Sequence, residues 1–278
     1  MMIGSPEPSL MTAAAAPIPR ADLALPIVET FHSLQGEGLH AGRSAFFIRL
    51  AGCTVGCSWC DTKHSWPAGV HPHRTLQELT AEARQAAAAG AAFVVITGGE
   101  PLHHDLDGLC TALRQASHSE GGKGADGGLP AGQAQQTGLP LPLPLHLETS
   151  GVDPLSGHFD WITLSPKRHR PPTDQLLAAC HELKVVVEGE ADLAFAEAMA
   201  ERALALRRQV ESRLGASAAA TETVADPDTD RQRLPAPPAL LLQPAWESGQ
   251  GQELAIAFVR SHPAWRLSLQ GHKWLGVR

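Results

Sequence analysis

The sequence predicts an α/β fold, in which a parallel sheet carries helices on its outer side. Short, nearly continuous apolar segments alternate along the chain with longer segments of helical character. Strands of this kind are buried on both faces, as in a parallel sheet covered by helices. Several apolar segments also end in glycine or polar residues, as in TGGE, ETSG and SPK. Because sites in such folds lie at the carboxyl edge of the sheet, we expect these strand ends to converge there.

The first half of the pattern starts with residues 44–52, an apolar strand that ends at a group of cysteines. Residues 75–90 open with a Thr-x-x-Glu capping box and close on glycine, so we expect a helix. The segment 91–99 is an apolar run that ends in two glycines, which predicts a buried strand. Residues 105–116 are expected to form the next helix.

The second half continues the alternation with the same criteria. The expected strands are 145–151, 159–167, 183–189, 239–244 and 265–270. The expected helices are 173–182, 192 to about 214, and 252–262. The pattern is continuous from one half to the other, which indicates a single domain.

Two stretches interrupt this pattern, and a third precedes it. Residues 118–143 are rich in Gly, Gln and Pro, and residues 214–238 in Ala, Thr, Asp and Pro. Neither stretch can bury enough apolar surface to offset its ordering entropy, so both are expected to be flexible insertions. Residues 1–22 are expected to be a disordered N-terminal extension. The remaining residues, 23–278, form the predicted domain.

Composition narrows the classes of function. The chain has 278 residues, of which 43% are hydrophobic, and a formal net charge of −7. This charge argues against non-specific nucleic-acid binding, which requires a basic surface. The sequence has no apolar run of about 18 residues and no basic segment followed by an apolar core near its start. We therefore expect a cytoplasmic protein without a membrane partner.

Three of the five cysteines, Cys53, Cys57 and Cys60, fall within CTVGCSWC. A tetrahedral zinc site usually takes two separated pairs of ligands, and here His64 is the nearest additional ligand. Three thiolates instead suit a 4Fe–4S cluster, because the fourth iron then remains open for another ligand. Both interpretations are open at this point, and the cluster is favoured. The other two cysteines fall within predicted helices, where they are expected to be buried structural residues: Cys110 and Cys180.

The spacing C-x3-C-x2-C, with an aromatic residue before the last cysteine, resembles the signature of the radical S-adenosylmethionine superfamily. The resemblance implies a partial or distorted (β/α) barrel, a 4Fe–4S cluster, and S-adenosylmethionine chelated by the open iron. TGGEP at 97–101, through Gly98, Gly99 and Glu100, resembles the motif that contacts the amino group of this cofactor. Together, the motifs assign cofactor contacts to Trp59, Cys60, Asp61, Gly99, Glu148, Ser165, Pro166, Lys167, Gln243 and Pro244.

A further set of polar residues precedes the cysteines. Gln35 and Glu37 flank Gly36, and Arg49 stands four residues before Cys53. An amide beside a carboxylate can bind the donor and acceptor edge of an aminopyrimidinone. Arg49 can pair with a substrate carboxylate. The alternative for Gln35 and Glu37 is a solvated hairpin turn.

The order LQGEG, CSWCDT, TGGEP, ETSG, SPK, LQP and LSLQGHKWLG resembles the 7-carboxy-7-deazaguanine synthase family over most of residues 25–278. The family's reaction converts 6-carboxy-5,6,7,8-tetrahydropterin to 7-carboxy-7-deazaguanine with loss of ammonia, on the route to queuosine. It begins with removal of a hydrogen atom from C6, followed by ring contraction. By this resemblance, the substrate contacts are Leu34, Gln35, Gly36, Glu37, Arg49, Thr97, His272 and Arg278.

The resemblance also implies Mg²⁺ close to the substrate carboxylate, with Thr62 as its protein ligand. One hydroxyl completed by substrate oxygens and water suits this hard ion. The chain departs from the family at its end, where Arg278 replaces a terminal proline whose carboxylate reaches the substrate.

The remaining implications concern partners and rival functions. The resemblance implies an electron donor such as flavodoxin or ferredoxin, and a homodimer. One rival is a radical activase of a glycyl-radical enzyme, which would lack the LQGEG segment and the HK-aromatic tail. The other is a non-enzymatic zinc-binding module.

Overall fold

A nine-stranded sheet organises the computed structural model, which describes residues 23–115, 142–218 and 236–278. The strand order is β3-β1-β2-β4-β5-β6-β7-β8-β9. The strands are β1 (Ala24–Leu34), β2 (Ser44–Leu50), β3 (His73–Thr75), β4 (Val94–Gly98), β5 (Leu145–Thr149), β6 (Trp161–Leu164), β7 (Glu182–Val187), β8 (Ala239–Pro244) and β9 (Trp265–Leu267). Thus every strand predicted from the sequence is present.

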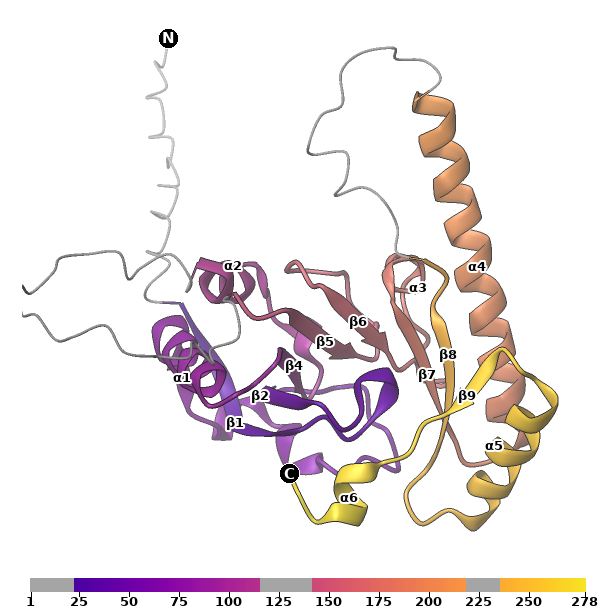
Figure 1. Ribbon diagram of the computed structural model, residues 1–278, viewed down its shortest axis with the longest axis horizontal. Coiled ribbons are helices and arrows are strands. Elements are labelled where there is room, and N and C mark those ends of the chain that lie inside the picture. The colour runs from indigo at the N-terminus through magenta and orange to yellow at the C-terminus, as the bar shows by residue number, and fades with distance from the viewer. Residues whose placement is uncertain (1–22, 116–141, 219–235) are drawn as a thin grey trace, which may run out of the picture.

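From β2 onward, neighbouring strands run parallel in chain order, so their carboxyl ends lie at one edge. Most of the connections contain helices, and these pack on the outer side of the sheet (Figure 1). The helices are α1 (Leu76–Ala88), α2 (Asp107–Gln115), α3 (Asp174–Ala179), α4 (Glu190–Ala218), α5 (Gly249–Ser261) and α6 (Gly271–Leu275). Because β9 pairs with β8 and the opposite edge strand is β3, the sheet does not close. The predicted partial barrel is confirmed.

The two faces of the parallel strands differ in chemistry. On β4, Val94 and Ile96 belong to the main core beneath the helices, whereas Val95 packs inside with Phe47 and Phe93. Such alternation follows from the two-residue period of a strand. Toward the carboxyl edge, the inner face becomes polar and forms the walls of the site.

Local signals explain where helix α1 begins. Thr75 Oγ1 accepts a hydrogen bond from the Glu78 amide at 3.2 Å. In return, the Glu78 carboxylate accepts one from the Thr75 amide at 2.8 Å. This is the predicted capping box, which satisfies two backbone donors at the start of the helix.

Some boundaries and elements differ from the prediction. Strands β1 and β3 are antiparallel additions to the parallel sheet, and neither was predicted. Helix α4 extends to Ala218 and so takes up the first residues of the predicted insertion 214–238, because alanine-rich sequence favours continuation of a helix. Leu143, at the end of the other predicted insertion, is buried in the core ahead of β5. The remaining parts of both insertions, apart from residues next to β5 and β8, lie outside the described residues, as does 1–22.

None of the helices in the described ranges is long and apolar enough to cross a membrane. The proposed limits of the single domain stay a prediction.

Candidate active site

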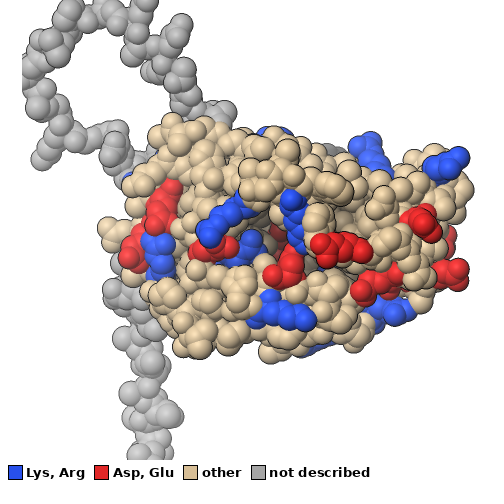
Figure 2. Space-filling view, turned by 90° about the horizontal axis from the view of Figure 1, so that it is seen from below, with Lys and Arg blue, Asp and Glu red and all other residues tan. Residues whose placement is uncertain are grey.

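Two adjoining pockets lie at the carboxyl edge of the sheet. The first, here called the cysteine pocket, includes Cys53, Cys57 and Cys60 in its lining. The second, here called the charged pocket, includes Glu37 and Arg49. Both pockets share lining residues, which are Asp61, Gly98, Glu148, Lys167, Gln270 and Lys273. Seen from below in Figure 2, charged side chains of both signs gather around a hollow on this side of the molecule.

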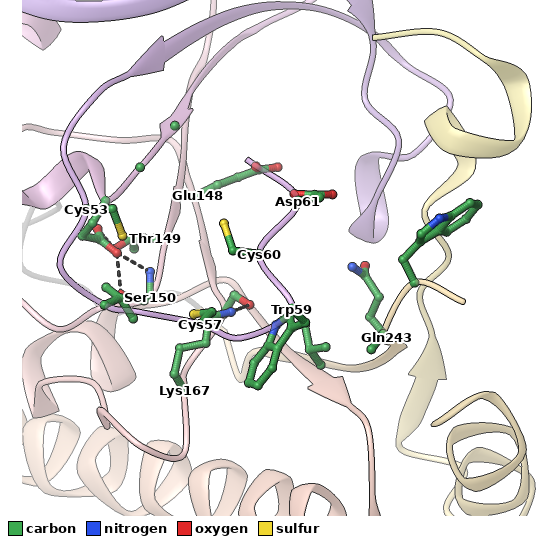
Figure 3. A pocket seen from close by; sticks show the side chains of 18 of the residues that line it. Cys53, Cys57, Trp59, Cys60, Asp61, Glu148, Thr149, Ser150, Lys167 and Gln243 are labelled. Atoms are coloured by element: carbon green, nitrogen blue, oxygen red, sulfur yellow. Dashed lines mark hydrogen bonds between the residues drawn. The ribbon is translucent and has the colours of Figure 1, made fainter. Parts of the chain in front are cut away.

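The loop that follows β2 carries the three cysteines (Figure 3). All three are free thiols; Cys57 is buried, and Cys53 and Cys60 are partly buried. Burial raises the pKa of the Cys53 and Cys57 thiols, so their thiolates require compensation, which iron would supply. Gly52 and Gly56 have positive φ values of 102° and 78°, which let the loop turn back on itself. Over the described ranges, no group of three or more His, Cys, Asp or Glu side chains is arranged to hold a single metal ion.

The end of β4 lies directly against this loop. A Cβ atom added to Gly98 would lie 2.1 Å from the Leu50 carbonyl oxygen, and one added to Gly99 would lie 2.3 Å from that of Gly52. Both distances are shorter than the contacts that real Cβ atoms make, so only glycine permits the close approach of the two segments. The glycines therefore serve the packing of β4 against this loop, and the predicted contact of TGGEP with the cofactor stays a prediction.

Glu100 lines the cysteine pocket, and its carboxylate is bound to protein groups. The residue is 1% exposed, and its carboxylate accepts hydrogen bonds from Thr149 Oγ1 at 2.5 Å and from Ser150 Oγ at 2.5 Å. The amides of Ser150 and Leu102 donate to it at 2.8 and 3.2 Å. Glu100 therefore joins the carboxyl ends of β4 and β5, and all of these donors would compete with a cofactor amino group.

Replacing Glu100 by alanine is expected to lower the free energy of unfolding by about 3 kcal/mol, because it leaves four donors unpaired in the interior. Urea unfolding monitored by circular dichroism measures this change. The exposed carboxylate of Glu78, replaced by alanine, provides the control and should give a smaller loss. A Glu100→Ala protein as stable as the parent would show that Glu100 does not hold the ends of β4 and β5 together.

The rest of the cysteine pocket brings the predicted cofactor residues together. Lys167 Nζ donates to Ser165 Oγ at 2.8 Å, and Gln243 accepts a hydrogen bond from Ser268 Oγ at 2.8 Å. Pro166 is buried and is not among the residues that line the pocket, so its cofactor contact stays a prediction. The predicted residues that line it are Trp59, Cys60, Asp61, Gly99, Glu148, Ser165, Lys167, Gln243 and Pro244.

The charged pocket brings together every residue predicted to contact substrate, and Thr62 as well. The lining includes Leu34, Gln35, Gly36, Glu37, Arg49, Thr62, Thr97, His272 and Arg278. Gln35 is 8% exposed, which excludes the solvated-turn alternative for that residue. Gln35 Nε2 donates to Glu148 Oε1 at 2.9 Å, and Thr97 Oγ1 donates to Glu148 Oε2 at 3.0 Å. Glu148 is thus fixed in the wall between the two pockets.

The C-terminal tail borders the charged pocket through Arg278. Glu29 pairs with Arg49 Nε at 3.0 Å, and its other oxygen pairs with Arg278 Nη1 at 2.7 Å. Glu29 and Arg49 are direct cross-strand partners in the β1–β2 pairing. The backbone oxygen of Arg278 accepts a hydrogen bond from Ser33 Oγ at 2.6 Å. Arg278 therefore anchors the tail at the place where the resemblance puts a proline.

Sequence reasoning missed several residues of the site: Glu29, Lys184, Gln270 and Lys273. Lys273 Nζ pairs with Asp61 Oδ2 at 2.5 Å, which ties the tail to the loop of the cysteines. Gln270 Nε2 donates to Glu37 Oε1 at 3.1 Å. Lys184 pairs with the same carboxylate from within β7. A charged pair at alternate positions of the apolar segment ELKVVV was the available signal for Lys184, since such residues share one face.

The donor set of the cysteine pocket fits a 4Fe–4S cluster and S-adenosylmethionine. Three thiols share one wall, and the other two cysteines are buried away from it in or beside helices. Glycine backbone, a carboxylate and amide groups surround the remaining space and can bind a polar cofactor. The charged pocket adjoins this space, so a molecule held there would lie next to the cofactor.

Comparison with known proteins agrees with this geometry. The family model of the radical SAM superfamily matches residues 47–154. A 7-carboxy-7-deazaguanine synthase from Prochlorococcus marinus is 49% identical over 254 residues, which cover 91% of this chain and 98% of that protein. The enzyme of the same name from Escherichia coli is 30% identical over 270 residues, which cover 91% of this chain and 98% of that protein. The crystal structure of QueE from Escherichia coli is similar with a TM-score of 0.59 at 27% identity, over 91% of this chain and 96% of that one. The chain therefore belongs to the 7-carboxy-7-deazaguanine synthase family of radical S-adenosylmethionine enzymes.

Proposed function

We propose that this enzyme converts 6-carboxy-5,6,7,8-tetrahydropterin to 7-carboxy-7-deazaguanine with loss of ammonia. The observation that carries the proposal is the pair of adjoining pockets, one with three thiols and one with paired acceptors and an arginine, in a chain of this family. The common wall at Glu148 would place the reacting carbon of a bound substrate beside the cofactor.

As a radical SAM enzyme, the protein uses a 4Fe–4S cluster and S-adenosylmethionine. When bound, these supply an electron and a 5′-deoxyadenosyl radical that removes a hydrogen atom from the substrate. Cys53, Cys57 and Cys60 would hold three irons. The remaining lining of the cysteine pocket would orient the cofactor, and Pro166 would support this wall from behind. Enclosure by these residues would protect reactive species from water.

The charged pocket supplies groups that match the substrate edge by edge. Glu37, held by Lys184 and Gln270, presents an ionised acceptor to the N–H groups of the pterin. Arg49 would pair with the substrate carboxylate. Glu148, held by Gln35 and Thr97, would accept a hydrogen bond from a further N–H group of the substrate. Leu34, Gly36 and His272 complete the wall.

Mg²⁺ is part of the proposal. Thr62 lines the charged pocket, and its hydroxyl lies 3.5 Å from Cys60 Sγ, between the two pockets. One protein hydroxyl with substrate oxygens and water suits this ion, which keeps much of its hydration shell. A flavodoxin or ferredoxin as electron donor and a homodimer are likewise proposed from family resemblance, and a cytoplasmic location is proposed from the composition of the sequence.

Anaerobic incubation tests the proposal directly. The reconstituted and reduced enzyme receives 6-carboxytetrahydropterin, S-adenosylmethionine and Mg²⁺, and mass spectrometry follows the products. We expect 7-carboxy-7-deazaguanine together with 5′-deoxyadenosine. Formation of 5′-deoxyadenosine without the deazaguanine would refute the assigned substrate while retaining the radical chemistry. Omission of Mg²⁺ should lower the rate, and a rate unaffected by the omission would count against the metal.

A further inference from the structure

Lys184 is a buried cation that lines neither pocket. It lies in β7 with 4% of its surface exposed, on the inner face of the sheet. Its ammonium group donates to Glu37 Oε2, which belongs to the connection between β1 and β2. The contact joins positions 147 residues apart in the chain. Lys184 thus reaches the charged pocket only through another residue.

We propose that Lys184 is a positioning residue for the substrate, which keeps the Glu37 carboxylate ionised and aimed into the charged pocket. This inference rests on the proposed function, in which Glu37 accepts hydrogen bonds from the pterin. Buried ion pairs often contribute little net stability, so a stabilising role alone does not account for a lysine at this position. A substrate contact that requires a charged acceptor accounts for both members of the pair.

The groups around Glu37 determine its protonation. Burial by itself would raise the pKa of Glu37, but the charge and hydrogen bond of Lys184, with help from Gln270 and His272, lower it to about 2. Lys167 and Glu182 also face this carboxyl electrostatically, with opposite signs. Glu37 is therefore ionised throughout the neutral range.

Lys184 is itself kept charged by its surroundings. Burial would lower the pKa of Lys184, but the carboxylates of Glu37, Glu148 and Glu182 outweigh this effect and raise it. The ammonium group does not become a neutral amine near pH 7, so it cannot act as a base there. The effect of the Lys184 charge is electrostatic, and it acts mainly on the Glu37 carboxylate, to which Lys184 donates a hydrogen bond.

Glu182 offers a matched comparison on the same strand. Its carboxyl accepts a hydrogen bond from the Leu39 amide at 2.9 Å and lines neither pocket. Burial raises the pKa of Glu182. A glutamine at this position retains the acceptor for Leu39 and removes one ionisable carboxyl from beside Lys184. The change leaves the Lys184–Glu37 pair in place.

The test measures substrate KM against pH in the reconstituted holoenzyme. In Lys184→Met, burial acts on Glu37 without its main opposing partner, so its pKa rises and protonation increases as pH falls. A protonated oxygen no longer accepts a hydrogen bond. We expect the KM for 6-carboxytetrahydropterin to be raised about 10-fold at neutral pH, because one charge-assisted hydrogen bond is lost. This KM should rise further toward pH 6, while kcat changes less.

Companion variants complete the test. Lys184→Arg, which keeps the charge, should show a KM that varies no more with pH than that of the parent, and so should Glu182→Gln. Glu37→Gln should raise KM, and adding Lys184→Met to it should add little. If Lys184→Met does not fold, Lys184→Gln takes its place with the same expectation. A KM for the uncharged variant with the parent's value and pH profile, or fully additive effects in the double variant, would overturn the inference.

The proposed function is judged separately by the parent enzyme. If the parent forms no 7-carboxy-7-deazaguanine, the substrate assignment fails whatever the variants do. If the parent forms it, the variants alone decide the role of Lys184. Unchanged electron paramagnetic resonance of the cluster and unchanged circular dichroism in each variant assign a KM effect to the charged pocket.

Discussion

Replacing Cys60 by alanine is expected to abolish product formation, with a loss greater than about 1,000-fold, the equivalent of roughly 4 kcal/mol in the barrier. Cys60 lies between Trp59 and Asp61 in the wall of the cysteine pocket, where the proposed cluster requires three thiolates. Loss of one thiolate leaves two iron ligands, which cannot fix a 4Fe–4S cluster with a single open iron. Absorbance, electron paramagnetic resonance and formation of 5′-deoxyadenosine measure the effect.

The matched control is Cys110→Ala. Cys110 is 2% exposed within α2 and packs close to Gly157, away from both pockets. Removal of its sulfur should cost about 1 kcal/mol of stability and leave the cluster spectrum unchanged. A Cys60→Ala enzyme with the parent's cluster spectrum and activity would show that the thiol is not a ligand. Loss of the cluster spectrum in Cys110→Ala would instead show that the cluster depends on Cys110, against the proposed set of ligands.

The alternating strands and helices of this fold are readable in the sequence because each is long enough to have a pattern. Strand β4 is an apolar run ending in glycines, and α1 carries its own cap. By contrast, β3 has three residues and α6 five, too few to show a period. Strand β1 reads ALPIVETFHSL, without a clean alternation, and its pairing with β2 is set by contacts with β2 rather than by local sequence.

The candidate site, like the fold, has a part that the sequence predicts and a part that it does not. Residues of the compact motifs line the two pockets, since LQGEG, CSWCDT and TGGEP each lie on a strand end or on the loop that follows one. Their contacts could not be predicted. Glu29 binds Arg278, which lies 249 positions further along the chain, and the Glu100 carboxylate accepts hydrogen bonds from the ETSG segment. Such pairings depend on which strands become neighbours, and no local spacing records them.

Replacing Arg49 by alanine is expected to lower kcat/KM by about 100-fold, chiefly through KM, because a charge-assisted pair with the substrate carboxylate is lost. Arg49 lines the charged pocket, and its side chain is 19% exposed. Its Nε binds Glu29, which leaves the terminal nitrogens of the guanidinium to face a substrate. Steady-state kinetics at several substrate concentrations give the two constants, and the cluster spectrum should stay that of the parent.

Two further variants separate the charge of Arg49 from the structure around it. Arg49→Lys keeps the charge without the paired donors, so its KM should fall between those of the parent and Arg49→Ala. Arg278→Ala removes an exposed guanidinium from the other oxygen of Glu29 and leaves the backbone contact with Ser33 in place, so a loss of less than about 10-fold is expected. Glu29 retains one arginine in either variant, which keeps the β1–β2 pairing intact. A Michaelis constant for Arg49→Ala equal to that of the parent would remove Arg49 from the substrate contacts. A larger loss in Arg278→Ala than in Arg49→Ala would instead place the substrate carboxylate at the C-terminal tail.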